Sequence, residues 1–136
     1  AANVNRVKGA VGYVEYAYVK KNNMTFMQLQ NADGKYVSPD DLTFASAAAG
    51  ADWLKVPGMG VSMVNAKGAN SWPISTASFI LMHKQPADKV AAAEALKFFD
   101  WAFMNGKKMA QDLDYVALPD TLTTQIRAKV WTQIQK

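Results

Sequence analysis

Few side chains in this sequence of 136 residues have the types and spacing that catalysis or metal binding requires. His83 is the single histidine and there is no cysteine, so a metal site would have to be built from carboxylates alone. Asp112 and Asp114 resemble a carboxylate pair, but residues two apart on a helix point away from each other. We therefore expect His83 to lie at the end of a strand and Asp112 and Asp114 to lie at a solvated helix end. We expect no catalytic residue and no metal site.

Ser75, Thr76 and Ser78 form a hydroxyl cluster of the kind that can hold an oxyanion. On a strand, however, successive side chains alternate between faces, so these three hydroxyl groups cannot all converge on one ligand. The sequence also lacks the G-x-S-x-G nucleophile elbow, the P-loop and the G-x-G-x-x-G fingerprint. Neither an enzyme nor a bound cofactor is therefore expected.

The charge balance is mildly basic. Lys and Arg number 15 against 11 Asp and Glu, for a formal net charge of +4 and a pI near 9.3. The only adjacent cations are Lys20-Lys21 and Lys107-Lys108, whereas a nucleic-acid surface usually needs a clustered basic face. Half of the residues are apolar, which is enough for a real core, and no stretch is long and apolar enough to span a bilayer. No nucleic-acid partner is expected.

The local patterns predict alternating helices and strands in the first half of the chain. Residues 1–8 are typical of the last turns of a helix that Gly9 caps, 10–14 of a short buried strand, and 16–21 of a helical turn. Residues 24–38 contain Asp33-Gly34 between alternating segments, which predicts two antiparallel strands. Ser38 as N-cap and Pro39 at the first helical position predict a helix over 40–49.

The second half begins with a loop rich in Gly and Asn over 55–71, with one short strand over 60–64. Residues 76–82 are apolar on both faces, as in a central strand. Periodic apolar positions then predict helices over 88–103, 105–113 and 120–134. The aromatic stripe from Phe98 to Phe103 is expected to be core.

Several stretches, taken in order, resemble one known family. They are GAVGYVEYAY (9–18), KKNNMTFMQLQNADGKYVSP (20–39), GADW (50–53), SWPISTASFILMHK (71–84), ALKFFDWAFMNGKKMAQDLDYVALPD (95–120) and IRAKVW (126–131). Together they look like the C-terminal portion of the periplasmic phosphate-binding protein of bacterial ABC phosphate importers. The resemblance covers nearly the whole chain.

The resemblance implies an α/β fold, a type II periplasmic-binding-protein-like clamshell, with this chain supplying the C-terminal part of both lobes. Residues 1–70 would be part of the second lobe and residues 76–136 part of the first. Residues 71–75, which we call the crossing segment, would carry the hinge at Trp72, Pro73 and Ile74. A proline after a loop rich in Gly and Asn suits such a place, because it fixes one backbone dihedral.

The resemblance also implies where phosphate binds. In the family the ligands are backbone amides, Ser and Thr hydroxyls, one Arg and one Asp of the N-terminal portion, including a Ser-Gly-Thr loop. This sequence has no Ser-Gly-Thr, and its only arginines are Arg6 and Arg127. We therefore expect no phosphate-binding residue in this chain, with the N-terminal half of the protein missing here. The tyrosine-rich opening, 9–18, is expected to be core of the second lobe.

Two functional classes follow. One is a non-enzymatic, periplasmic solute-binding component that captures inorganic phosphate, through the N-terminal remainder of the protein, and delivers it to the membrane subunits of an ABC permease. The alternative is an independent small α/β domain that binds a protein partner. A second chain supplying missing strands would distinguish the two.

Overall fold

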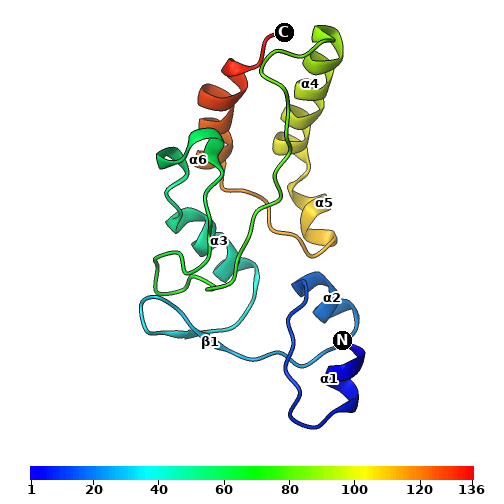
Figure 1. Cartoon of the computed structure of the whole chain (residues 1–136), viewed down its shortest axis with the longest axis vertical. Coiled ribbons are helices and arrows are strands. Elements are labelled where there is room, and N and C mark those ends of the chain that lie inside the picture. Colours follow the sequence, from blue (N-terminus) through cyan, green and yellow to red (C-terminus); the bar gives the residue numbers. More distant parts are fainter.

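Helix α3 (Asp41–Gly50) lies near the middle of the chain's long axis in the computed structural model, which describes residues 1–136 (Figure 1). Its first turn is closed by a reciprocal pair of hydrogen bonds. The Asp40 carboxylate accepts from the Thr43 amide at 2.8 Å, and the Thr43 hydroxyl accepts from the Asp40 amide at 3.0 Å. The N-cap is therefore Asp40 and not Ser38 as predicted, because only Asp40 has this partner three residues later.

The buried face of α3 carries small side chains. Thr43, Ala47 and Ala48 are buried, whereas Leu42 is 80% exposed. The small side chains on the buried face allow neighbouring loops to approach the helix closely. The predicted helix over 40–49 is confirmed.

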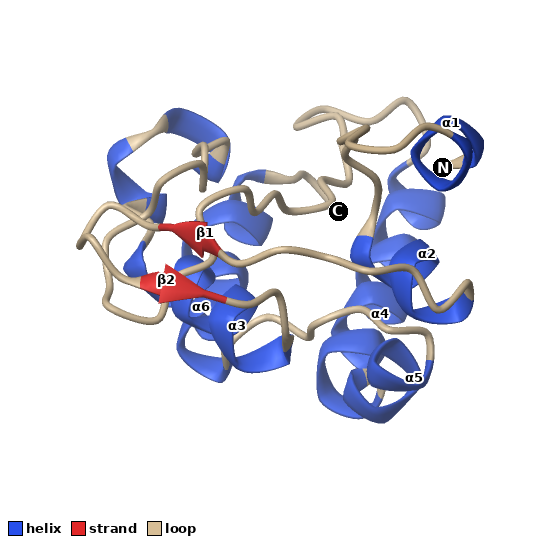
Figure 2. Cartoon of the chain, turned by 90° about the horizontal axis from the view of Figure 1, so that it is seen from below, coloured by secondary structure: helices blue, strands red, loops and turns tan.

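The sheet is a single antiparallel pair, β1 (Leu29–Gln30) and β2 (Tyr36–Val37), that lies beside α3 (Figure 2). Leu29 is opposite Val37, and the turn between the strands places Gly34 at a φ of 73°. A positive φ costs glycine little, which explains the Asp-Gly signal. The predicted hairpin over 24–38 is confirmed, although its ladder is much shorter than that range.

Two other predicted strands, 10–14 and 76–82, are wrong for this chain: both segments are irregular. A strand exists only where a neighbouring backbone pairs with it, and neither segment has such a neighbour here. The predicted strand over 60–64 is reduced to one isolated antiparallel bridge, between Val64 and Ile74. The chain is therefore mainly helical, and the α/β clamshell is not visible in it.

The predicted N-terminal helices are present as α1 (Ala2–Arg6) and α2 (Tyr16–Lys21). Gly9 has the left-handed conformation expected of it, with a φ of 80°. It does not cap α1 directly, because the helix ends at Arg6 and Gly9 lies in the turn that follows.

Three helices close the chain, as predicted. They are α4 (Lys89–Asn105), α5 (Lys107–Asp112) and α6 (Asp120–Gln125), which continues as a π-helical turn over Ile126–Val130 and a 3₁₀ turn over Trp131–Gln133. The Asp88 carboxylate caps α4 by accepting from the Ala91 amide at 2.9 Å. In Figure 1, α4 and α6 lie toward the end of the molecule that carries the C-terminus, whereas α5 lies lower, between α4 and α2.

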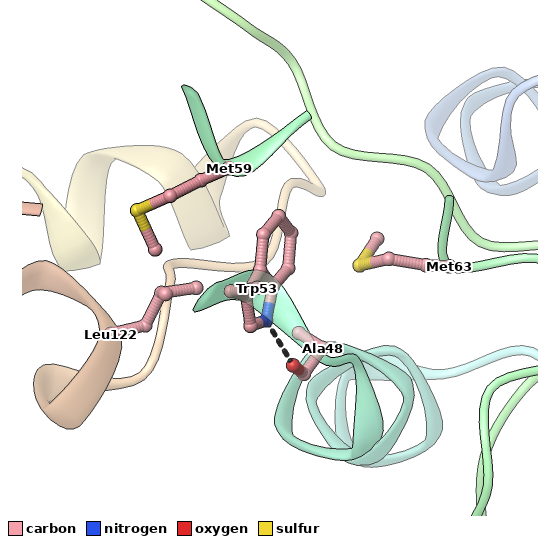
Figure 3. Packing of buried hydrophobic residues seen from close by; sticks show 5 residues of the cluster. All are labelled: Ala48, Trp53, Met59, Met63 and Leu122. Carbon is pink, nitrogen blue, oxygen red and sulfur yellow. Dashed lines mark hydrogen bonds between the residues drawn. The ribbon is translucent and has the colours of Figure 1, made fainter. Parts of the chain in front are cut away.

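The main core is small and is centred on Trp53 (Figure 3), which lies in a 3₁₀ turn over Trp53–Lys55. The Trp53 indole N–H donates to the Ala48 carbonyl at 2.7 Å, and Met59 and Met63 complete its surroundings together with Leu122. Residues from both sides of the crossing segment therefore share one cluster. The assignment of 1–70 and 76–136 to different lobes stays a prediction.

The aromatic stripe on α4 is only partly core. Ala92 and Leu96 are buried, and Phe103 is half-buried with its ring stacked on Trp131 at a centroid distance of 5.5 Å. Phe98 and Trp101, in contrast, are 58% and 47% exposed. The stripe is core only in part, because the turns that follow α6 contact Asp100 and Phe103 of α4 and leave Phe98 and Trp101 exposed.

Candidate functional site: the crossing segment and its anchors

The crossing segment is held against α3 and against the loop before it. Trp72 and Pro73 are buried, and Ile74 is 55% exposed. The Trp72 amide donates to the Thr43 carbonyl at 3.1 Å, while the Pro73 carbonyl accepts from the Asn65 amide at 2.8 Å. The backbone on both sides of the Trp72-Pro73 bond is therefore fixed by hydrogen bonds.

Two serines of the crossing segment have hydroxyl groups that donate hydrogen bonds to nearby backbone carbonyls. Ser71 is fully buried; its hydroxyl donates to the Lys67 carbonyl at 2.9 Å and lies 3.0 Å from the Ser46 hydroxyl of α3. The buried Ser75 hydroxyl donates to the Trp72 carbonyl at 3.1 Å. Thr76 and Ser78 are exposed, so the predicted hydroxyl cluster does not converge and its buried member has an internal partner.

Asn31 is the anchor that sequence reasoning missed. Its side chain is buried, and the amide nitrogen and the amide oxygen each make two hydrogen bonds. The amide nitrogen donates to the carbonyls of Gly68 at 3.2 Å and Ala69 at 2.9 Å, and the amide oxygen accepts from the amides of Asp33 at 3.1 Å and Lys35 at 3.0 Å. An Asn before an Asp-Gly turn indicates the local bonds to Asp33 and Lys35. The bonds to Gly68 and Ala69 are tertiary contacts that no sequence pattern indicates.

Gly68 makes this packing possible. Its φ is 129°, and a Cβ added there would lie 2.6 Å from the Ser71 hydroxyl and 3.3 Å from the Ser46 hydroxyl. Both the backbone conformation and the space therefore require glycine. We call Asn31, Ser46, Gly68 and Ser71 the junction, because they join the hairpin, α3 and the approach to the crossing segment.

Edge-to-face aromatic contacts connect the crossing segment to α2. The Trp72 ring lies 6.4 Å from the Phe44 ring of α3, and Phe44 lies 5.4 Å from Tyr16 of α2. Tyr16 also contacts Phe26 at 5.9 Å. In this chain the expectation that the tyrosine-rich opening is core is met by the half-buried Tyr16 and not by Tyr13, which is 96% exposed.

An ion pair joins α2 to the segment after α5. Asp114 forms an ion pair with Lys20, and this hydrogen-bonded contact raises the pKa of the Lys20 ammonium above its ordinary value. Next to it, the Glu15 carboxylate raises the pKa of the Tyr115 hydroxyl.

The remaining candidate residues are separate from one another. His83 and Arg6 are exposed, and no group of three potential ligands could hold a metal ion. The Arg127 guanidinium donates to the Asp100 carboxylate at 2.7 Å, so it is already occupied by an internal anion. Asp112 pairs with Lys108 along α5 and Asp114 pairs with Lys20. The two carboxylates therefore have different partners and do not form a pair with each other.

Among the open hollows of the surface, two bring together residues of several elements. One, of about 310 Å³, lies beside Trp53 and Pro119; its Lys55 is 2.7 Å from Asp52, and this cation lowers the pKa of the Asp52 carboxyl. The other, of about 470 Å³, lies between α4 and the C-terminal turns. Two of its three cations are paired internally, Lys97 with Glu94 and Arg127 with Asp100. Neither hollow gathers free donors of the kind that a desolvated anion needs.

No helix of the chain combines the length and the apolar character needed to cross a bilayer.

Comparison with known proteins places the sequence among relatives of bacterial phosphate-binding proteins. It is 44% identical over 135 residues, 99% of the chain, to the phosphate-binding protein PstS of Pasteurella multocida. The PstS proteins of Xylella fastidiosa and Haemophilus influenzae match at 44% over 94% of the chain and at 40% over its full length. The resemblance inferred from the sequence is thereby confirmed.

The chain spans only about two fifths of these relatives: 39%, 35% and 41% of their respective lengths. No family model matches the chain.

We expect Gly68→Ala to destabilise the chain by about 1–3 kcal/mol, because alanine is strained at this φ and its methyl group would displace the Ser71 hydroxyl. Gly60→Ala is the matched control, since Gly60 has a φ of −75° and open space around it. Its effect should stay below about 1 kcal/mol. Urea unfolding followed by tryptophan fluorescence measures both, and equal effects would show that the junction is not as tightly packed as described.

Proposed function

We propose that this chain is part of a periplasmic solute-binding protein that captures inorganic phosphate and delivers it to the membrane subunits of an ABC permease. The observation that carries the proposal is the 44% identity over 99% of the chain to a phosphate-binding protein. In this role the protein binds and releases its ligand without chemistry, which is consistent with side chains that form no catalytic constellation. The comparisons do not favour the alternative of an independent interaction domain.

Phosphate binding would require the rest of the protein. A desolvated phosphate needs several convergent donors and at least one cation. Here Arg127 is paired with Asp100, and the hydroxyls of Ser71 and Ser75 are satisfied internally. The ligands would therefore come from outside these residues, and this chain would position them.

We further propose that residues 1–70 and 76–136 belong to the two lobes of a clamshell and that Trp72, Pro73 and Ile74 form a hinge. The backbone is held through Trp72, Pro73 and Ile74 and has no regular structure from Thr76 onward, and a hinge requires such a change from held to less restrained backbone. The cluster of Trp53 and Leu122 would then lie at the base where the lobes meet. The segments 10–14 and 76–82 would pair with strands of the remaining protein.

The proposed function is tested with a chimera in which this chain replaces the matching segment of the Pasteurella multocida phosphate-binding protein. We expect titration calorimetry to show micromolar or tighter binding of phosphate to the chimera, competed by arsenate and not by sulfate. The isolated chain should show none. A folded chimera without phosphate binding would contradict the function, and tight binding by the isolated chain would contradict the placement of the ligands.

The hinge is tested by Pro73→Gly in the same chimera. Glycine frees the dihedral that proline fixes, so the balance between open and closed forms should shift and change the apparent phosphate affinity about threefold or more. Pro86→Gly is the control, because Pro86 lies in a loop outside the crossing segment. Unchanged affinity, together with unchanged closure by small-angle scattering, would exclude a hinge at this position.

A further inference from the structure

An ion pair bridges parts of the chain that lie on opposite sides of the crossing segment. Lys20 of α2 pairs with Asp114. Beside it, the Glu15 carboxylate raises the pKa of the Tyr115 hydroxyl. The other ion pairs of the chain join residues within 1–70 or within 76–136. Lys20–Asp114 is thus the one ion pair that spans the crossing segment.

The backbone presents Asp114 for this contact. The Tyr115 amide donates to the Ala110 carbonyl and the Asp114 amide to the Gln111 carbonyl, both at 2.9 Å, which closes α5 with a Schellman motif. Asp114 occupies its left-handed position with a φ of 61°, where glycine is usual. Asp tolerates this conformation better than most residues, but it gains nothing locally that glycine would not give. The gain comes from Lys20, which the carboxylate reaches across the structure.

Lys20 is in turn connected to the crossing segment. Its ammonium lies 5.8 Å from the centre of the Tyr16 ring, and Tyr16 contacts Phe44, which contacts Trp72. A movement of the Trp72 backbone would therefore disturb the rings that support Lys20. Contiguous packing of this kind can carry coupling between the two places.

We propose that Lys20 and Asp114 form a latch that fixes the parts on either side of the crossing segment relative to each other and favours the closed, phosphate-bound form. These two are positioning residues, because they would act on phosphate only through the arrangement of the two parts. The inference rests on the proposed function and deepens it. The Lys20 and Asp114 side chains are 46% and 28% exposed, so water screens the pair and its effect should be modest and weaker at high salt.

The test uses Asp114→Asn and Lys20→Gln in the chimera. Asn keeps the tolerance for the left-handed conformation and removes only the charge. Each variant should weaken phosphate affinity about two- to fivefold, mainly through faster dissociation, and the double variant should be no weaker than either single one. Asp112→Asn is the matched control, because Asp112 pairs with Lys108 inside α5 and bridges nothing. Unchanged affinity, or additive losses, would overturn the latch.

A second measurement does not depend on phosphate. The chain has no cysteine, so Lys8→Cys and Lys129→Cys, both at exposed positions, allow specific labelling for energy transfer between the two parts. Asp114→Asn should broaden the distance distribution and Asp112→Asn should leave it unchanged. A broadened distribution in a chain whose chimera fails to bind phosphate would support the latch while refuting the proposed function. Identical distributions in all variants would overturn the latch whatever the chimera binds.

Discussion

The fold depends on the junction, where the Asn31 side chain satisfies two backbone carbonyls of a distant loop. These two hydrogen bonds tie the half-buried Gly68 and the exposed Ala69 to the hairpin, and the Gly68 carbonyl also accepts from the Ser71 amide at 2.9 Å. Gly68 lets the loop approach α3 closely, and the hydrogen bond between the Ser46 and Ser71 hydroxyls joins the end of the loop to the helix. The hairpin, α3 and the crossing segment are thus held by one small polar network and not by a large apolar core.

The position of this network bears on function. The junction holds the chain immediately before Trp72, and the Trp72 amide is bonded to α3. After Ser75 the backbone runs without regular pairing to the start of α4. A rigid anchor followed by a less restrained segment suits the proposed hinge between two lobes, and the ion pair between Lys20 of α2 and Asp114 suits the proposed latch.

Sequence reasoning predicted the elements whose signals are local. The capped helix over 40–49, the Asp33-Gly34 hairpin and the three closing helices carry their own turn residues and apolar periodicity, and all are present. The segments 10–14 and 76–82 were predicted as strands from composition, but pairing is a property of two backbones, and one sequence pattern does not contain it. The role of Asn31 was missed for the same reason, since its partners at Gly68 and Ala69 are distant in the sequence.

Hydrogen exchange, compared between the isolated chain and the chimera, tests most directly the claim that this chain is an anchored part of a larger binding protein. The amides of Lys35, Thr43 and Trp72, which are bonded at the junction and to α3, should exchange slowly in both proteins. Residues 10–14 and 76–82 should exchange fast in the isolated chain and become protected in the chimera. Fast exchange at the junction amides, or unprotected 10–14 and 76–82 in a folded chimera, would contradict the account.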